Sequence, residues 1–368
     1  MIRIILLLVI VNISSLLFSQ NSSQRTISKT DYLDKVHGGW IGKIAGLTLG
    51  VPLEFDEPWP PTDITYFAQV PDYFSDHHSG DDAYFPLLAQ TCLEKYGLHP
   101  TYSQIMKEYD ERFYSGRVWG ATSKAIDLYR AGIMPPKTGF PGYNGWADLD
   151  AMIAFDPLGW ICPGMMNKSA EYADYWAHIV SWGEGADGCV FIDALYSEAF
   201  FTSDINMLIQ KAVEVLPVKS RFHELITDIY LWHEQNKDWR DAKSLLEKKY
   251  NNKDGKADIS AITNTGAVLI GLLYGEKDFG KTVIIAMQCQ WDSDCNAATA
   301  GGILGTVLGF SNIDPKWSLI FHDKYENYCL KGLPRWLSIK EIAENTVALG
   351  EKVILENKGK ISTVGNKV

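Results

Sequence analysis

The 368-residue chain contains no cluster of lysine and arginine. Its 34 basic side chains are outnumbered by 45 acidic ones, which gives a formal charge of −11 at pH 7. Proteins that bind nucleic acid obtain most of their affinity from clustered cations, so this composition argues against nucleic acid as a partner. Hydrophobic residues make up 46% of the chain, enough for a packed core, and disorder is excluded for most of its length.

Long hydrophobic runs are absent except at the N-terminus. Residues 4–11 form an unbroken apolar run after Arg3, and residues 16–18 extend it before Ser19 and a polar stretch. The run falls short of the roughly 20 residues that a membrane-spanning helix needs, and the pattern is typical of a secretory signal peptide. We therefore expect residues 1–19 to be cleaved. We expect the mature protein to be exported, to the periplasm or the extracellular space, without a membrane anchor.

The six cysteines include no closely spaced CxxC pair, and none lies near the expected cleavage point. This spacing indicates neither a cysteine-rich metal site nor a lipid anchor. An exported protein can form disulfides, but a chain of this length does not need them for stability. We expect mostly free, buried thiols, with room for one disulfide whose partners the sequence does not assign.

Alternating patterns typical of β-strands are nearly absent, whereas apolar residues recur at helical spacing along most of the chain. The first such segment has its apolar residues between 32 and 44, and Thr30 and Asp31 are start signals before it. Further helices are predicted over 84–94, 102–113, 121–131, 170–180, 190–201, 206–215, 222–234, 242–250, 265–274, 279–289, 297–308 and 339–356. Because no repeat or linker divides the chain, we predict one compact all-α domain over residues 26–356, with a polar tail at 357–368.

Glycines are regularly placed in the first predicted helix. Gly42, Gly46 and Gly50 lie four residues apart and therefore share one side of it. A glycine inside a helix costs about 1 kcal/mol relative to alanine, so three in register need a compensating reason. Bare glycines let another backbone or a ligand approach closely, and we expect one or the other along this side.

Two stretches without helical spacing, 52–80 and 135–144, are rich in proline, glycine and aromatic residues. Long loops on a helical scaffold commonly carry function. The chain also has 12 tryptophans, which either cover flat ligands such as sugars or fill a large core. Both explanations remain open for the tryptophans in or beside irregular segments, which are Trp59, Trp146, Trp160 and Trp182.

Two acidic motifs open predicted helices: Asp81-Asp82, and Asp292 with Asp294. Each motif alone is explained more simply as helix capping, since carboxylates satisfy free N–H groups at a helix start. Two such motifs before small-residue helices favour a shared site. Four carboxylates brought together repel one another unless a cation is bound, and Mg²⁺, Mn²⁺ and Ca²⁺ prefer oxygen ligands. Glu54 is a fifth acid, either part of this site or a solvated loop charge.

The sequence resembles the ADP-ribosylglycohydrolases, the family of dinitrogenase-reductase-activating glycohydrolase. The motifs that carry the resemblance occur in the family's order and are residues 42–54 (GKIAGLTLGVPLE), 79–82 (SGDD) and 291–301 (WDSDCNAATAG). Residues 156–159 (DPLG), 163–164 (PG) and 275–279 (GEKDF) extend it over nearly the whole mature chain. The WDxDCN pattern is similar to that of a bacterial branch of the family.

The resemblance implies an all-α fold that holds two Mg²⁺ or Mn²⁺ ions and hydrolyses the glycosidic bond at C1 of an ADP-ribosyl group. The implied ligands are Asp81 and Asp82 on one ion and Asp292 on the other, with Asp294 bridging. Glu54 would lie near the metals and the attacking water. The proton acceptor is either Glu54 or a metal-bound aspartate, so Glu54, Asp82 and Asp294 are the catalytic candidates.

Three positions depart from the family pattern. Many members have a hydroxyl residue where this chain has Gly80, Ala83 and Cys295. Hydroxyls suit a hard ion better than a thiol does, so Cys295 is an unusual candidate ligand.

The middle of the chain supplies candidates for substrate binding. Asp156 is either a cleft carboxylate or a helix cap. Asn144 follows a proline- and glycine-rich loop and is expected at the pocket rim, and Asp187 is expected in a flexible turn that lines the pocket. For His77 and His78, polar loop contacts are favoured over metal ligation.

Three functions remain open from the sequence. The first is metal-dependent hydrolysis of an ADP-ribosyl or related ribosyl conjugate. The second keeps the fold and the metal but acts on a different exported or scavenged glycoside, which the export signal and the tryptophans favour. The third is a non-catalytic ADP-ribose or sugar-binding protein, suggested by the three departures. A pure binder has little need of four mutually repelling carboxylates.

Overall fold

The computed structural model describes residues 25–51, 54, 80–144, 147–251 and 259–362. Several sequence predictions lie outside these residues: the signal peptide at 1–19, nearly all of the 52–80 loop with Trp59, His77 and His78, Trp146, and the last six residues of the tail.

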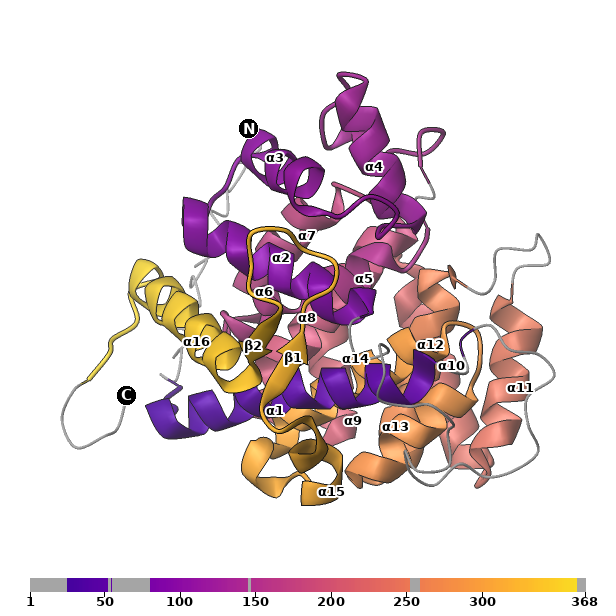
Figure 1. Ribbon diagram of the computed structural model, residues 1–368. Helices are drawn as coiled ribbons and strands as arrows, with labels where there is room; N and C mark the ends of the chain where they lie inside the picture. Colours follow the sequence, from indigo (N-terminus) through magenta and orange to yellow (C-terminus); the bar gives the residue numbers. More distant parts are fainter. Residues whose placement is uncertain (1–24, 52–53, 55–79, 145–146, 252–258, 363–368) are drawn as a thin grey trace, which may run out of the picture.

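Helices dominate the described residues, as predicted. The α-helices are α1 (Lys29–Gly50), α2 (Asp81–Tyr96), α3 (Tyr102–Arg112), α4 (Gly120–Arg130), α5 (Asp150–Ala154), α6 (Pro157–Trp160), α7 (Met166–Ala177), α8 (Glu184–Ala199), α9 (Ile205–Ala212), α10 (Arg221–Gln235), α11 (Trp239–Tyr250), α12 (Ala261–Tyr274), α13 (Phe279–Gln288), α14 (Ser293–Leu308), α15 (Pro315–Ser318) and α16 (Ile339–Glu356) (Figure 1). Single 3-10 turns are η4 (Lys137–Gly139), η5 (Val213–Val215), η7 (Phe310–Asn312) and η8 (Leu319–Phe321).

The predicted helices are all present, with ends displaced by a few residues. The helices that the sequence did not predict are α5, α6 and α15, which are too short to show a helical period. Two short strands, β1 (Lys324–Glu326) and β2 (Trp336–Ser338), pair antiparallel, with Lys324 opposite Ser338. At three residues each, they show no detectable alternation.

The helix pair α1 and α14 packs backbone against backbone. A Cβ placed on Gly42 would overlap the carbonyl oxygen of Gly301, and one on Gly46 would overlap that of Ala297. The contacts run in opposite chain directions, so the start of α14 lies at the end of α1. Figure 1 shows the C-terminal end of α1 and the N-terminal end of α2 on the same side of the molecule. The glycine spacing therefore marks close helix packing, which places the start of α14 beside the end of α1.

Tryptophans fill the core around this pair. Trp40, Trp160, Trp176 and Trp317 are fully buried. Trp160 lies against Trp40 at a ring-centroid distance of 5.0 Å, and its indole N–H donates to Thr306. Trp160 is therefore a core residue and not part of a sugar-facing loop.

All six cysteines are free and buried, as expected. Among the described residues, no helix combines the length and the apolar character that crossing a membrane requires.

Candidate metal centre and active site

Five acidic side chains converge where α1 ends and where α2 and α14 begin. One carboxylate oxygen each from Asp81, Asp82 and Asp294, with Sγ of Cys295, lie within 4.8 Å of one another. One oxygen each from Glu54, Asp292 and Asp294 form a second such group. We call these five acids and Cys295 the acidic cluster. Its two groups share Asp294.

Helix capping does not account for these acids. The N-cap of α2 is Gly80, which has no side chain, and the side chain of Asp292, the N-cap of α14, accepts no capping hydrogen bond. Asp81 Oδ1 accepts only the adjacent N–H of Asp82, at 3.1 Å. By contrast, Ser28 caps α1 and accepts from the backbone N–H of Asp31 at 2.9 Å. The carboxylates of the cluster are therefore available for another partner.

The oxygen atoms of the cluster fit a cation. Asp82 Oδ2, Asp292 Oδ1 and Asp294 Oδ1 are buried and have no hydrogen-bond partner among the described residues. A buried carboxylate oxygen without a partner is strongly unfavourable. A divalent cation with oxygen ligands supplies that partner, so the residues present fit the metal that the family pattern implies.

Burial and mutual repulsion raise the pKa values of four acids of the cluster, Glu54, Asp81, Asp292 and Asp294. The pKa of Glu54 is raised to about 7 by desolvation and by the charges of Asp81 and Asp82. The pKa of Asp294 is raised to about 8, first by desolvation and then by Glu54 and Asp82. Desolvation and neighbouring acids also hold the pKa values of Asp81 and Asp292 well above their ordinary range. A bound cation would oppose these shifts, because it favours the ionised carboxylates.

The turn that leads into α14 has a strained backbone and is held by hydrogen bonds to Asn264. Gln290 and Trp291 have positive φ angles of 67° and 57°, which non-glycine residues rarely adopt. Asn264 of α12 accepts from the backbone N–H of Asp292 at 3.3 Å and from the Asn296 side chain at 2.8 Å. Strain of this kind is common at functional sites. Sequence analysis missed Asn264, although a lone asparagine in an apolar helix is the signal that marks it.

Gly50 permits the end of α1 to rest on the cluster. A Cβ there would overlap the Cα of Asp294. The chain then turns, with the Glu54 N–H donating to the Val51 carbonyl at 3.3 Å. Because Gly50 has no side chain, the chain that leads to Glu54 can pass close to Asp294.

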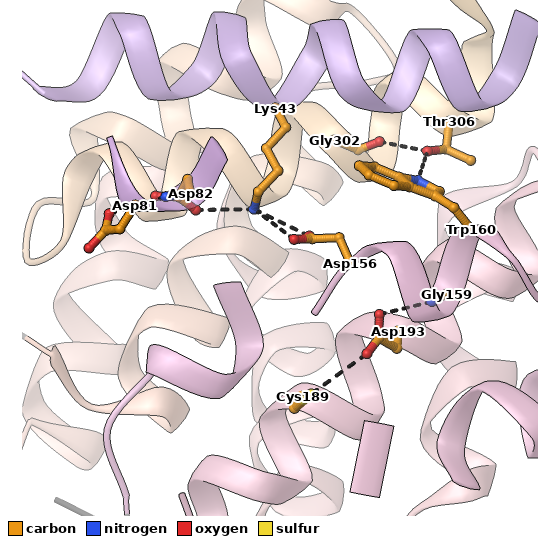
Figure 2. Close-up of polar contacts among 10 residues, drawn as sticks. All are labelled: Lys43, Asp81, Asp82, Asp156, Gly159, Trp160, Cys189, Asp193, Gly302 and Thr306. Atoms are coloured by element: carbon orange, nitrogen blue, oxygen red, sulfur yellow. Dashed lines mark hydrogen bonds and ion pairs between the residues drawn. The ribbon is translucent and has the colours of Figure 1, made fainter. Parts of the chain in front are cut away.

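A buried lysine that sequence analysis missed adjoins the cluster. Lys43 of α1 has no exposed surface, and its Nζ lies 3.1 Å from Asp82 Oδ1. Nζ also lies 3.2 Å from each carboxylate oxygen of Asp156 (Figure 2). The two carboxylates raise the pKa of Lys43, although burial alone would lower it. The signal in the sequence was the single charged residue between Gly38 and Gly50, in the glycine-rich second half of the helix.

Asp156 is the N-cap residue of α6, but its carboxylate neither caps the helix nor lies in an open cleft. It is 1% exposed and makes no side-chain cap bond to α6, and burial raises its pKa to about 6 despite Lys43. Behind it, Asp193 of α8 accepts from the Gly159 N–H at 3.1 Å and from Cys189 Sγ at 3.6 Å (Figure 2). The carboxylate of Asp156 is therefore buried as a partner of Lys43, and its contact with substrate stays a prediction.

Asn144 is placed beside the start of α4. Its side chain is half-buried and donates to the Ala121 carbonyl at 2.8 Å. The next residue, Thr122, donates its N–H to Asp150 at 2.9 Å. Asp150, which the sequence did not single out, is close enough to Asp81 to raise the pKa of that residue. Asn144 is thus linked toward the acidic cluster through Ala121, Thr122 and Asp150.

Asp187 does not lie in a flexible turn, which corrects the sequence prediction. It belongs to the first turn of α8 and accepts from the Ser220 hydroxyl at 2.6 Å. The charges that influence its pKa are Glu184, Asp174 and His178, none of them in the acidic cluster. The structure therefore does not bring Asp187 to the site.

Fold and site together define a helical protein with a carboxylate-lined place for divalent cations. The ADP-ribosylglycohydrolase family model matches residues 28–349, so the chain belongs to this family and is a hydrolase of glycosidic bonds. A solved structure described as an ADP-ribosylglycohydrolase-related protein complex is similar in fold, with a TM-score of 0.61 and 17% identity over 88% of this chain and 99% of that one. No match was found among curated proteins.

Proposed function

We propose that the protein is a metal-dependent hydrolase that cleaves the glycosidic bond of an ADP-ribosyl or related ribosyl conjugate with two bound Mg²⁺ or Mn²⁺ ions. The observation that carries the proposal is the pair of ligand groups that share Asp294. Two-metal hydrolytic sites commonly hold their ions about 3.5–4 Å apart, and a shared carboxylate is a natural bridge between them.

The residues divide between the two ions. Asp81, Asp82 and Cys295 would hold one, Asp292 and Glu54 would lie at the other, and Asp294 would contribute to both. When bound, such cations bind substrate hydroxyls and lower the pKa of a water. The thiol of Cys295 is a softer donor than a hydroxyl, which favours Mn²⁺ over Mg²⁺ in the first group.

Glu54 is the residue that we assign to accept a proton from the attacking water. It is only partly buried, so water can reach it, and a cation held beside it by Asp292 and Asp294 would keep its carboxylate ionised, as a base must be. Departure of the leaving group builds positive charge on the ribose ring. The neighbouring carboxylates, among them Asp82 and Asp294, stabilise that charge.

Calorimetric titration of the purified chain, first with Mg²⁺ or Mn²⁺ and then with ADP-ribose, tests this proposal. We expect both metals to bind, and ADP-ribose to bind only when metal is present. Metal binding without ADP-ribose binding would instead favour a different sugar substrate. ADP-ribose binding that is unaffected by metal would favour a non-catalytic binder, and an absence of metal binding would contradict the proposal.

A further inference from the structure

We infer that Lys43 is a positioning residue for Asp82: it holds one carboxylate oxygen of Asp82, presents the other to the cation, and thereby sets which divalent cations the site accepts. The inference rests on the proposed function, since it takes Asp82 to be a metal ligand.

The two oxygens of the Asp82 carboxylate have different surroundings. Its Oδ1 accepts a hydrogen bond from Lys43 Nζ at 3.1 Å, whereas its Oδ2 is buried without a partner among the described residues. The side chain has no exposed surface, so water does not compete for either oxygen. A carboxylate anchored through one oxygen has lost most of its freedom to rotate, and the other oxygen is aimed in a fixed direction.

Lys43 is itself held firmly. Its ammonium donates hydrogen bonds to Asp82 Oδ1 at 3.1 Å and Asp156 Oδ1 at 3.2 Å, and Asp156 Oδ2 completes the ion pair at 3.2 Å (Figure 2). The side chain starts from α1, which is locked onto α14 through its glycines. Lys43, which holds Asp82, is thus fixed both at its backbone, by α1, and at its Nζ, by the carboxylates.

Asp156 is fixed in turn by the packing of α6. Its carbonyl accepts from the N–H groups of Gly159 at 3.0 Å and Trp160 at 3.2 Å. A Cβ on Gly159 would lie 2.6 Å from the carbonyl oxygen of Asp193, so α6 is pressed against α8. The chain of contacts from α8 through Asp156 and Lys43 leaves Asp82 little room to move.

Fixed ligand geometry has different consequences for different cations. Mg²⁺ requires a nearly ideal octahedral arrangement, whereas Ca²⁺ accepts irregular ones. If Lys43 is lost, Asp82 can rotate, and Mg²⁺ affinity should fall more than Ca²⁺ affinity. Removing a nearby positive charge, by itself, would change both affinities by the same factor, because both ions carry the same charge. The ratio of the two affinities therefore separates positioning from simple electrostatics.

The test is to titrate the full chain calorimetrically with Mg²⁺ and with Ca²⁺, comparing Lys43→Met with Lys35→Met. Lys35 is a matched control on the same helix, partly buried, and its Nζ donates to the backbone carbonyls of Val307 at 2.7 Å and Thr306 at 3.2 Å. We expect the ratio of the Mg²⁺ Kd to the Ca²⁺ Kd to rise about tenfold or more in Lys43→Met, the size of effect that partners of metal ligands usually have. Lys35→Met should leave it unchanged.

A second variant guards against loss of folding. Lys43→Met leaves two buried carboxylates, Asp82 and Asp156, without the lysine ammonium that neutralises them. The double variant Lys43→Met/Asp156→Asn removes one charge of each sign. We expect the same change in the ratio. Equal shifts for both cations, or no shift, in a folded variant would overturn the inference while leaving the proposed function standing. A native chain that binds neither cation would overturn both.

Discussion

Replacing Asp294 with asparagine should abolish hydrolysis, with a loss on the order of 10³-fold or more in kcat/KM. Asp294 is the one residue common to both ligand groups, so its loss weakens both cation positions together. Kinetics and calorimetry with Mn²⁺ would measure the two effects. Asp127→Asn, an exposed acid on α4, is the matched control and should retain cation binding. Unchanged Mn²⁺ affinity in Asp294→Asn would contradict the assignment of Asp294 as the shared ligand.

In the absence of metal, Asp294→Asn should make the chain more stable at high pH. The pKa of Asp294 is about 8 in the folded, metal-free protein and about 4 when unfolded, so this residue opposes folding increasingly as pH rises through that interval. Asparagine cannot ionise and escapes this cost. Chelated Asp294→Asn should therefore melt above the native chain at pH 8 but not at pH 4. Added Mn²⁺ should reverse the order at pH 8, because it stabilises only the chain that binds it.

Replacing Gly50 with alanine should cost about 2–3 kcal/mol of stability and also weaken cation binding. The added methyl group would overlap the backbone of Asp294, which cannot give way as a flexible side chain can. Either the α1–α14 contact opens or Asp294 is displaced, and both outcomes disturb the cluster. Chemical denaturation and Mn²⁺ titration would measure the two losses.

Alanine substitutions at two other glycines separate the loss of stability from the loss of cation binding. Gly42→Ala should destabilise the chain to a similar degree with less effect on cations, because its clash is with Gly301, two turns along α14 from Asp294. In Gly188→Ala of α8, the added methyl group would meet only side chains, with Phe222 nearest at 3.3 Å, and the change should cost less than about 1 kcal/mol. If Gly50→Ala behaved like Gly188→Ala, the close approach at Asp294 would not hold the site together.

The sequence predicted what depends on local pattern. Helical spacing was enough for the long helices, and glycines four residues apart were enough for the close contact of α1 with another backbone. The acidic motifs converge at two helix starts, and the α1–α14 packing places one of them, the start of α14, beside the end of α1. The short elements were missed, since α6 and the β1–β2 pair contain too few residues to show any period.

What depends on tertiary packing was not predictable from one chain. Nothing local marks Asp156 as the partner of Lys43, which is 113 residues away in the sequence. Nothing local marks Asp150 as a neighbour of Asp81 either. Asn264 stands out within its helix, but the sequence does not show that its contact is Asp292. Asp187 was misjudged because its glycine-rich neighbours resemble a turn, whereas they open α8. Sequence identified the acids of the site but not the buried residues that orient them.

Product analysis tests the central claim most directly. The purified chain would be incubated with one N-linked and one O-linked ADP-ribosyl conjugate, in Mn²⁺ or in excess chelator, and released ADP-ribose would be quantified by mass spectrometry. The proposed mechanism predicts release from at least one conjugate in Mn²⁺, and none in chelator or with Asp294→Asn. Equal release in Mn²⁺ and in chelator would contradict hydrolysis by a metal held in the acidic cluster.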